Sequence, residues 1–446
     1  ALRRSETGEI TKWKARLVCN GQTQCHGVDY DRVFSTVVKM STLRLVLVLA
    51  CERRYFLTSV DICQAFIQAE VRTPLYMRMP PGLPNKDAKG RTLVARLQKS
   101  LYGLKQAGRE FNMVLNDHLV KLGFERSSID TCVYSRRDGR GDVLLAVWVD
   151  DILIASSNHS VRAEFVKALT QRFPIEDKGD LTWILGMRIA HDRGKAEVTV
   201  SQQLYVQDMM TKYAPFLDSA CRSYDVPTVE NLTLSADQQP TEGSPEEGVM
   251  DDKRQFYMTV VGCILWLAAC TRPDIAHVTS LLARFVANPG MHHYRALIRV
   301  LVYLRTTASY GLVYRPDSDV PLQIYSDANW SEQNSTSGAL FYMHGCLFAW
   351  FSRVQRSTSH STAEAEYKAA SDAARDGIFH RESLRDLGYP LKGPTTMLLD
   401  SKSAIDMCFD PVAFKKTKHI LRDAYFLRDL VAREVFAPEH VTSEME

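Results

Sequence analysis

Two adjacent aspartates, Asp150 and Asp151, interrupt the apolar stretch VLLAVWVDDILIAS, which covers residues 143–156. Such a stretch is typical of a buried strand, or of two strands joined by a tight turn. Burying an ionised carboxylate is costly, and two neighbouring carboxylates also repel each other. The pair therefore lies either in a β-turn exposed to water, or in a site that holds divalent cations with the help of further carboxylates.

Asp61 is the carboxylate that best completes such a cation site. It ends the apolar part of LTSVDICQAF and precedes a helix-like segment, so on its own it could equally cap that helix. An aspartate at a strand end together with an acidic pair in a hairpin is the arrangement of a polymerase palm. There the carboxylates hold two Mg²⁺ ions about 3.5–4 Å apart, which activate a primer 3′-hydroxyl and stabilise the leaving pyrophosphate.

A second acidic set lies near the C-terminus. Asp327 in LQIYSDANW and Asp400 in TMLLDSKSA each end a strand-like run, and Glu366 lies in the helix-like STAEAEYKAASDAA. Ser361 and Glu364 can open that helix as a capping box. Singly, the aspartates suit turns or caps and Glu366 a solvated helix face. As an ordered set they could converge on one metal pair at a sheet edge.

Composition limits the class of protein but does not identify a binding partner. The 446 residues predict two or three domains, and 45% apolar with 24% charged residues is ordinary for a globular protein. A net charge of +3 argues neither for nor against a polyanionic partner. None of the ten cysteines forms a CxxC pair, so a zinc ribbon is not expected and the cysteines are expected to be reduced. The chain opens without Met, and we expect it to be part of a longer protein.

The elements that must position these acids follow from patterning. Residues 43–54 and 100–124 are helix-like, and RDGRGD at 137–142 has the composition of a hairpin turn. Residues 221–256 carry eight acidic and three basic residues among few large apolar ones, which predicts a linker. Residues 257–307 are helix-like, and the chain returns to an α/β pattern from 322.

An ordered series of motifs resembles a known family. KARLVCNGQTQCHGVDYDRVFSTVVKMSTLRLVLVLA, SVDICQAF, SLYGLKQAGREF, VWVDDILIAS and WILGMRI follow one another as in the reverse transcriptase of copia-type LTR retrotransposons. YMTVVGCILWLAACTRPDIAHVTSLLARFVANP and the later blocks resemble the connection and ribonuclease H of the same Pol polyproteins. The resemblance covers nearly the whole chain.

The resemblance implies an α+β and α/β architecture built as a right-hand polymerase followed by a ribonuclease H-like mixed sheet. We expect fingers and palm at 1–160, a thumb-like region at 161–220, the acidic linker at 221–256, a helical connection at 257–320, and the ribonuclease H-like domain at 321–446.

The resemblance also assigns residues for polymerisation. Asp61, Asp150 and Asp151 match the metal-binding aspartates, and Phe66 matches the aromatic that crowds the sugar 2′ position. Lys14 and Arg16 match residues that contact the incoming triphosphate, although on their own they suit an exposed basic strand. The loop beneath template and nucleotide corresponds to residues 103–106 and includes Lys105 and Gln106. Residues 185–187 match the turn that grips the primer terminus.

For the nuclease, the resemblance assigns Asp327, Glu366 and Asp400 to the metals, with His419 in product release or proton transfer. Leu421 stands where the family has an acid, and Asp423 is the nearest substitute ligand. In the polymerase, Trp148 stands where the family has Tyr, and Gly108 where it has Pro. We expect none of these departures to remove a polymerase ligand.

The sequence thus predicts an RNA-directed DNA polymerase fused to a ribonuclease H, with two Mg²⁺ or Mn²⁺ ions per site. The expected partners are an RNA template, a DNA primer, the RNA–DNA hybrid, deoxynucleotides, and the capsid, protease and integrase regions of the polyprotein. Membrane association is not expected. The expected location is in cytoplasmic virus-like particles, with nuclear entry of the product complex. The rival hypothesis is a decayed or co-opted copy that binds nucleic acid without catalysis.

Overall fold

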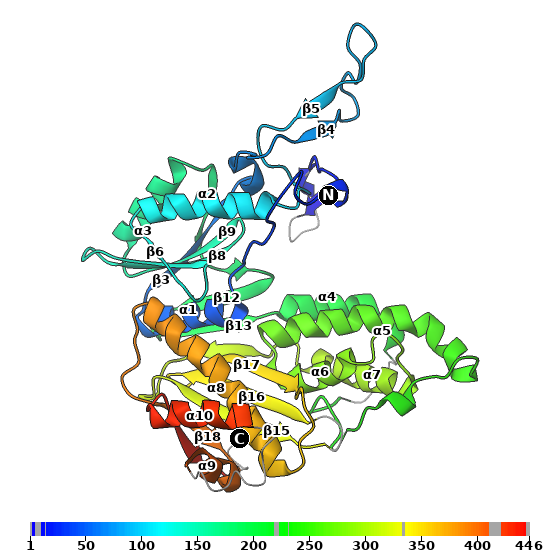
Figure 1. Ribbon diagram of the computed structural model, residues 1–446, viewed down its shortest axis with the longest axis vertical. Coiled ribbons are helices and arrows are strands. Elements are labelled where there is room, and N and C mark those ends of the chain that lie inside the picture. The colour runs from blue at the N-terminus through cyan, green and yellow to red at the C-terminus, as the bar shows by residue number, and fades with distance from the viewer. Residues whose placement is uncertain are drawn as a thin grey trace. The chain divides into compact units, whose positions relative to one another are not determined.

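The computed structural model describes residues 2–4, 10–13, 15–217, 223–230, 232–331, 335–409 and 421–442. The chain forms two compact units: residues 1–38 with 57–180, and residues 39–56 with 181–446. Figure 1 labels their helices and strands. Among the described helices, none has both the length and the apolarity needed to cross a membrane.

The first unit is built on a six-stranded sheet in the order β10-β3-β9-β8-β7-β6. Its strands are β3 (Phe56–Ile62), β6 (Glu125–Arg126), β7 (Val133–Arg137), β8 (Asp142–Trp148), β9 (Asp151–Ser156) and β10 (Ile175–Asp180). The predicted turn at 137–142 joins β7 to β8, which pair antiparallel. Strands β8 and β9 also pair antiparallel, and only residues 149 and 150 separate them. The apolar stretch is therefore two strands with a tight turn.

Two helices cover one face of this sheet. Helices α2 (Ala107–Lys121) and α3 (His159–Thr170) contribute Phe111, Leu115 and Phe165 to the same buried cluster as Val60 and Leu145 of the strands. The remaining elements of this unit are short. They are β1 (Leu2–Arg4), β2 (Ile10–Trp13), η1 (Gly21–Thr23), η2 (Ala65–Gln68), and the antiparallel ribbon of β4 (Tyr76–Arg78) and β5 (Val94–Arg96). Figure 1 shows this ribbon extending away from the sheet.

Helix α1 (Met40–Glu52), predicted as part of the palm, instead lies in the second unit. Its residues 42–51 are all buried, so the helix needs packing partners around its whole circumference. The buried guanidinium of Arg44 donates to the carbonyl oxygens of Phe348, Ala269 and Cys270 at 2.7–2.8 Å. These contacts tie α1 to the C-terminal half of the chain, which is why the predicted 1–160 region does not form one body.

The second unit contains a four-stranded antiparallel sheet and a helical cluster. The sheet has the order β11 (Trp183–Ile184), β12 (Met187–Asp192), β13 (Glu197–Ser201) and β14 (Gly311–Tyr314). The helices are α4 (Gln203–Tyr213), α5 (Pro245–Cys270), α6 (Ala276–Ala283) and α7 (Met291–Thr306), with the short turns η3 (Ala214–Phe216), η4 (Ala236–Gln238) and η5 (Pro273–Ile275). The four helices share one apolar core.

Two predicted boundaries differ from the structure. Helix α3 and strand β10 belong to the first unit because β10 pairs with β3, so the thumb-like region does not begin at 161. The predicted linker contains the start of α5, which begins at Pro245 rather than near 257. Ser244 caps α5, and Glu246 and Glu247 lie in its first turn, where a helix favours negative charge. Acidic residues that suggested a linker therefore include helix N-terminal residues.

The C-terminal part of the second unit is a five-stranded mixed sheet in the order β17-β16-β15-β18-β19. The strands are β15 (Gln323–Asn329), β16 (Thr336–Met343), β17 (Cys346–Val354), β18 (Thr395–Leu399) and β19 (Phe436–His440). Pairing is antiparallel from β17 to β15 and parallel from β15 to β19. Helix α8 (Thr362–Asp386) packs on β15 and β16, and α9 (Lys402–Phe409) and α10 (Leu421–Ala432) pack on α8. The predicted mixed-sheet domain with helices is confirmed.

Candidate active sites

The first acidic cluster lies where β8, β9 and β3 meet. Asp151 begins β9, Asp150 occupies the second position of the turn before it, and Asp61 lies near the end of β3. The Ile62 amide donates to the Asp150 carbonyl oxygen at 2.8 Å, which brings the end of β3 against the turn. The structure therefore brings together the three aspartates that the sequence singled out for the polymerase.

The turn itself is held in a strained conformation. Val149 has φ +56°, in the left-handed region that β-branched residues rarely adopt. Such strain persists only where surrounding structure imposes it, and it concentrates at functional sites. The strained residue therefore lies directly before Asp150, in the two-residue turn that positions it.

Lys178 joins this cluster and was not singled out from the sequence. Its Nζ lies 2.7 Å from Asp151 Oδ1 and 3.3 Å from Asp61 Oδ2. The register of β10 against β3 shifts between Asp177 and Gly179, so Lys178 occupies a bulge. A glycine inside a strand pattern often marks a bulge, and Gly179 was the available signal.

Charge explains why a cation suits these acids. Partial burial, followed by the charges of Asp61 and Asp151, raises the pKa of Asp150 above its ordinary value. Partial burial lowers the pKa of Lys178, but its pairing with Asp151 and Asp61 more than offsets this and leaves the pKa raised. Carboxylate oxygens are also the ligands that Mg²⁺ prefers. The donor set fits a magnesium site.

The residues assigned to the nucleotide side form two groups in the first unit. The Arg16 guanidinium lies 5.4 Å from the Tyr102 ring centroid, and the same ring packs edge-on against Phe66 at 4.9 Å. Lys105 Nζ donates to the Gln24 carbonyl oxygen at 3.1 Å and to the Tyr30 hydroxyl at 3.3 Å. Lys14 lies outside the described residues.

The Gln106 side chain stabilises the surrounding loops. Its buried amide donates to the Asp29 carbonyl oxygen and accepts from Gln24 Nε2, each at 3.1 Å. Gly103 likewise approaches the chain itself, since a Cβ built there would lie 2.1 Å from the Cys19 carbonyl oxygen, and its φ is +90°. A small residue is therefore needed at 103 because the loop packs closely against residues 18 and 19.

The predicted primer-grip turn is a two-residue connection between β11 and β12 in the second unit. Leu185 and Gly186 have φ +49° and +74°. Positive φ at both positions is the mark of a type I′ hairpin turn, which glycine tolerates and leucine rarely adopts. Met187, the first residue of β12, is fully buried.

The second acidic cluster is tighter than the first. Asp327, Glu366 and Asp400 each offer a carboxylate oxygen, and these atoms lie within 4.8 Å of one another, the one such grouping of three metal-ligating side chains found among the described residues. Parallel pairing of β15 with β18 sets Tyr325 opposite Leu398, so Asp327 and Asp400, two residues further along, are level. Glu366 reaches them from α8, where its Oε1 accepts from the Ala328 amide at 3.1 Å.

Glu364, the other acid at the start of α8, has a different place. Ser361 Oγ accepts from the Glu364 amide at 3.2 Å, and the Glu364 carboxylate accepts from the His360 amide at 3.1 Å. Lys368 Nζ lies 2.7 Å from the same carboxylate. Glu364 therefore caps the helix, and Glu366 faces the aspartates.

Asp423 is not brought to this cluster. It accepts from Ser371 Oγ at 3.2 Å and forms an ion pair with Arg375 of α8. The Leu421 backbone begins α10, and His419 lies outside the described residues. The described metal-binding set is therefore Asp327, Glu366 and Asp400.

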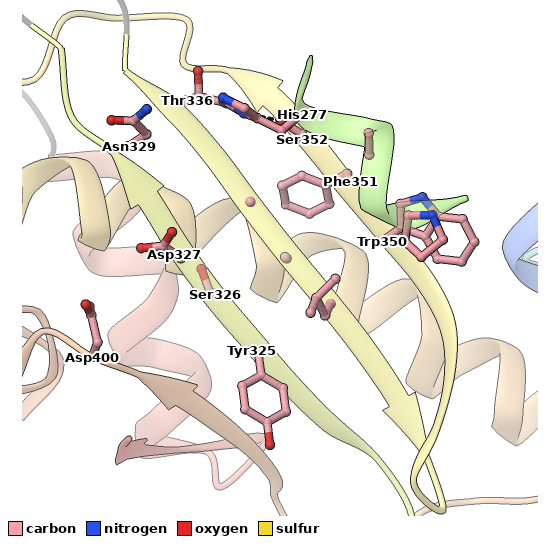
Figure 2. Close-up of a pocket in the computed structure, with 15 residues that line it drawn as sticks. His277, Tyr325, Ser326, Asp327, Asn329, Thr336, Trp350, Phe351, Ser352 and Asp400 are labelled. Carbon is pink, nitrogen blue, oxygen red and sulfur yellow. Dashed lines mark hydrogen bonds between the residues drawn. The ribbon is translucent and has the colours of Figure 1, made fainter. Parts of the chain in front are cut away.

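Burial and like charge also perturb this second site. Burial, followed by the charge of Asp400, raises the pKa of Asp327. A cavity of about 480 Å³ opens beside the two aspartates, lined by residues of the sheet and by His277 of α6 (Figure 2). Three hard oxygen donors at a solvent-accessible cavity fit a divalent cation.

Comparisons with known proteins show which family the chain belongs to. A family model described as "Reverse transcriptase (RNA-dependent DNA polymerase)" matches residues 3–229. The chain is 32% identical over 438 residues to the retrovirus-related Pol polyprotein from transposon TNT 1-94 of Nicotiana tabacum, covering 97% of this chain and 32% of that protein. It is 30% identical over 322 residues to the putative transposon Ty5-1 protein of Saccharomyces cerevisiae, covering 71% of this chain and 100% of that protein.

Two further proteins are similar to this chain. The Pol polyprotein from transposon RE2 of Arabidopsis thaliana is 31% identical and covers 98% of this chain and 29% of its own length. A foamy viral protease-reverse transcriptase solved in complex with double-stranded DNA is 12% identical, with a TM-score of 0.48, and the match covers 99% of this chain and 64% of that chain. The chain spans about a third of the length of the plant polyproteins. It belongs to the reverse transcriptase (RNA-dependent DNA polymerase) family, in the form found in Pol polyproteins of copia-type retrotransposons.

Proposed function

We propose that this chain is an RNA-directed DNA polymerase that extends a DNA primer on an RNA template, fused to a ribonuclease H that cleaves the RNA of the resulting hybrid. The observation that carries the proposal is that Asp61 and Asp151 share the ammonium of Lys178, with Asp150 in the adjoining turn, in a chain of the reverse transcriptase family. A region this acidic at a strained turn suits phosphoryl transfer better than a structural role.

In the polymerase, Asp61, Asp150 and Asp151 would hold Mg²⁺, or Mn²⁺, two ions per site. When bound, the metal activates the primer hydroxyl and neutralises charge on the triphosphate. Arg16 supplies a guanidinium to the triphosphate, with its neighbour Tyr102 orienting it. Phe66, packed against the same ring, crowds the sugar 2′ position and favours deoxynucleotides.

The assigned loop residues act through position. Lys105 and Gln106 brace residues 24–30 against the start of α2, and this network sets the shape of the nucleotide side of the site. Lys14 is proposed as a second phosphate contact. Lys178 balances the aspartate charge until metal and substrate bind.

In the nuclease, Asp327, Glu366 and Asp400 would hold the two metal ions, and the metals supply an activated water for hydrolysis of an RNA phosphodiester. His419 is proposed to assist product release or proton transfer. Asp423, paired with Arg375, would have to leave that ion pair to reach a metal.

The proposed partners follow from this activity: an RNA template, a DNA primer, deoxynucleotides, the hybrid product, and the capsid, protease and integrase regions of a longer polyprotein. Cytoplasmic virus-like particles are the proposed location. The rival proposal, a copy that binds nucleic acid without catalysis, is favoured by one observation: Asp423, the nearest substitute for the acid that the family has at position 421, is engaged by Arg375.

Primer extension on an end-labelled RNA annealed to a DNA primer tests the proposal. We expect deoxynucleotide incorporation in Mg²⁺ or Mn²⁺, its loss in excess chelator and on Asp61→Asn, and shortening of the RNA behind the growing end. Binding of the hybrid by a folded protein without extension in either metal would support the non-catalytic rival.

A further inference from the structure

The nuclease cavity is not built by the five-stranded sheet alone. Asp327 and Asp400 lie on one side of it, and His277 of α6, a helix of the predicted connection, lies across from Asp400 (Figure 2). The connection therefore supplies a polar side chain to the space in which the hybrid would be cut.

His277 is held in place by its surroundings. Its Nδ1 lies 3.4 Å from Ser352 Oγ on β17, against which α6 packs. Just before α6, the fully buried Arg272 pairs with Asp274 at 2.7 Å and donates to the Thr307 carbonyl oxygen at 3.0 Å. The start of α6 is thus anchored on two sides, so the imidazole has a defined position while its side chain stays exposed.

The floor of the cavity leaves room for a ligand backbone. Gly338 of β16 lies in the floor, and a Cβ built there would find only the Asp327 carbonyl oxygen, at 3.8 Å. Thr336, Asn329 and Ser352 add hydroxyl and amide groups on the side of His277. A lining of hydroxyls, an amide and an imidazole beside an acidic metal site suits a sugar–phosphate chain.

The imidazole is suited to donate one hydrogen bond without adding charge. The protein atoms packed around one side of the ring partly desolvate it and lower the pKa of His277, and the charge of Asp327 only partly opposes this, so the ring is neutral near pH 7. A neutral imidazole carries one donor and one acceptor. Ser352 engages one ring nitrogen, which leaves the other for the cavity that the side chain lines.

We propose that His277 is a positioning residue for hybrid cleavage, which hydrogen-bonds the sugar–phosphate backbone of the RNA strand beside the bond cut at Asp327 and Asp400. The inference rests on the proposed ribonuclease H activity and adds a substrate contact from outside the ribonuclease H-like domain. The competing explanation is that His277 only fastens α6 to β17 through Ser352.

Steady-state cleavage by the full chain separates these two explanations. We expect His277→Ala to raise the KM for hybrid cleavage about tenfold, the size of one lost hydrogen bond to a charged group, with a smaller change in kcat. His277→Gln, which keeps a donor, restores part of the affinity. His277→Phe keeps a ring packed on β17 but has no donor: the proposed contact predicts a KM as high as in His277→Ala, whereas a fastening role alone predicts a KM near that of the wild type. His292→Ala, an exposed histidine of α7, is the matched control.

A crosslink provides a readout that does not need turnover. In Ca²⁺, His277→Cys should attack a small mixed disulfide tethered to an RNA phosphate of the hybrid, which links protein to RNA and releases the small thiol, and His292→Cys should not. Absence of wild-type cleavage with the crosslink present would refute the nuclease proposal while supporting the contact. Cleavage by wild type with KM unchanged in His277→Ala, or with KM in His277→Phe close to that of the wild type, would overturn the role of His277 and leave the nuclease proposal intact.

Discussion

At the scale of single residues, the polymerase site depends on how charge is balanced around Asp150. Its pKa is raised by burial and by Asp61 and Asp151, whereas the charge of Lys178 lowers it. Removing the ammonium leaves three carboxylates facing one another, so protons compete better with metal. Lys178 therefore sets the lower pH limit at which the site is ready for cations.

We accordingly expect Lys178→Met to move the acidic limb of the extension pH profile upward. The sign follows because loss of a positive neighbour favours the protonated carboxyl and raises the pKa of Asp150 further. Extension rates measured across pH at fixed Mg²⁺ test this, with the exposed Lys121→Met as a charge-matched control. A limb that stays in place, or moves to lower pH, would show that Lys178 does not tune the aspartates.

The packing of Phe66 against Tyr102 makes a second residue-scale prediction. Phe66→Ala opens space beside the sugar, so ribonucleotide incorporation should rise at least about tenfold relative to deoxynucleotide incorporation, since a steric clash of a few kcal/mol is removed. Competing extension assays with the two nucleotide types measure the ratio. Phe34→Ala, which truncates an exposed phenylalanine of the same unit, should leave it unchanged. If the ratio of ribonucleotide to deoxynucleotide incorporation is unchanged in Phe66→Ala, another group excludes the 2′-hydroxyl.

Most of the acids were predictable because each ends an apolar run and because they occur in ordered sets, which turn or cap residues alone do not explain. Asp61, Asp150, Asp327 and Asp400 all follow this rule. Lys178 was missed because its contacts depend on a bulge in β10, and the one signal for that bulge, Gly179, lies among charged residues that do not look like a strand. His277 was missed because nothing in a helix sequence tells which sheet lies beneath it.

At the scale of elements, the nuclease acids rely on close packing of α8 against the sheet. A Cβ at Gly377 would lie 2.7 Å from Ile324 Cδ1 and 2.9 Å from Phe436 Cζ, so either these two buried side chains or the helix itself would have to shift. Helix α8 also carries Glu366, which means that its depth sets the distance from Glu366 to the strand aspartates.

We expect Gly377→Ala to destabilise the protein by about 1–3 kcal/mol through overpacking. Gly262→Ala in α5 is the matched helix-interior change: its Cβ meets nothing within 4 Å, so it should stabilise by about 0.5–1 kcal/mol. Thermal unfolding with metal absent compares the two. If Gly377→Ala unfolds at or above the wild-type temperature, α8 is not packed as described.

The boundaries and packing partners of two helices could not be predicted from the hydrophobic and charge pattern of the sequence. Helix α1 was predicted from its apolar run, but a helix buried on all sides does not say which partners bury it, and Arg44 points to residues more than 200 positions away. The start of α5 was placed too late because Glu246 and Glu247 look equally suited to a solvated linker and to a capped first turn.

At the scale of the whole molecule, the chain carries two acidic sites in two separately compact units. Asp61, Asp150 and Asp151 lie in the first, and Asp327, Glu366 and Asp400 in the second. The two acidic sets in the sequence predicted two sites. The sequence did not predict which residues belong to which compact unit. Chain order placed 39–56 with the palm, whereas packing places it with the C-terminal half.

The central claim is that these two sites perform separate reactions on one nucleic-acid substrate. Asp150→Asn and Asp327→Asn each remove one anionic ligand while nearly preserving shape, so each should affect one site alone. A single hybrid with labelled primer and labelled RNA measures both reactions in one tube. We predict that Asp150→Asn abolishes extension and retains RNA cleavage, and that Asp327→Asn does the reverse. Loss of both activities in either folded variant, or of neither, would contradict the account.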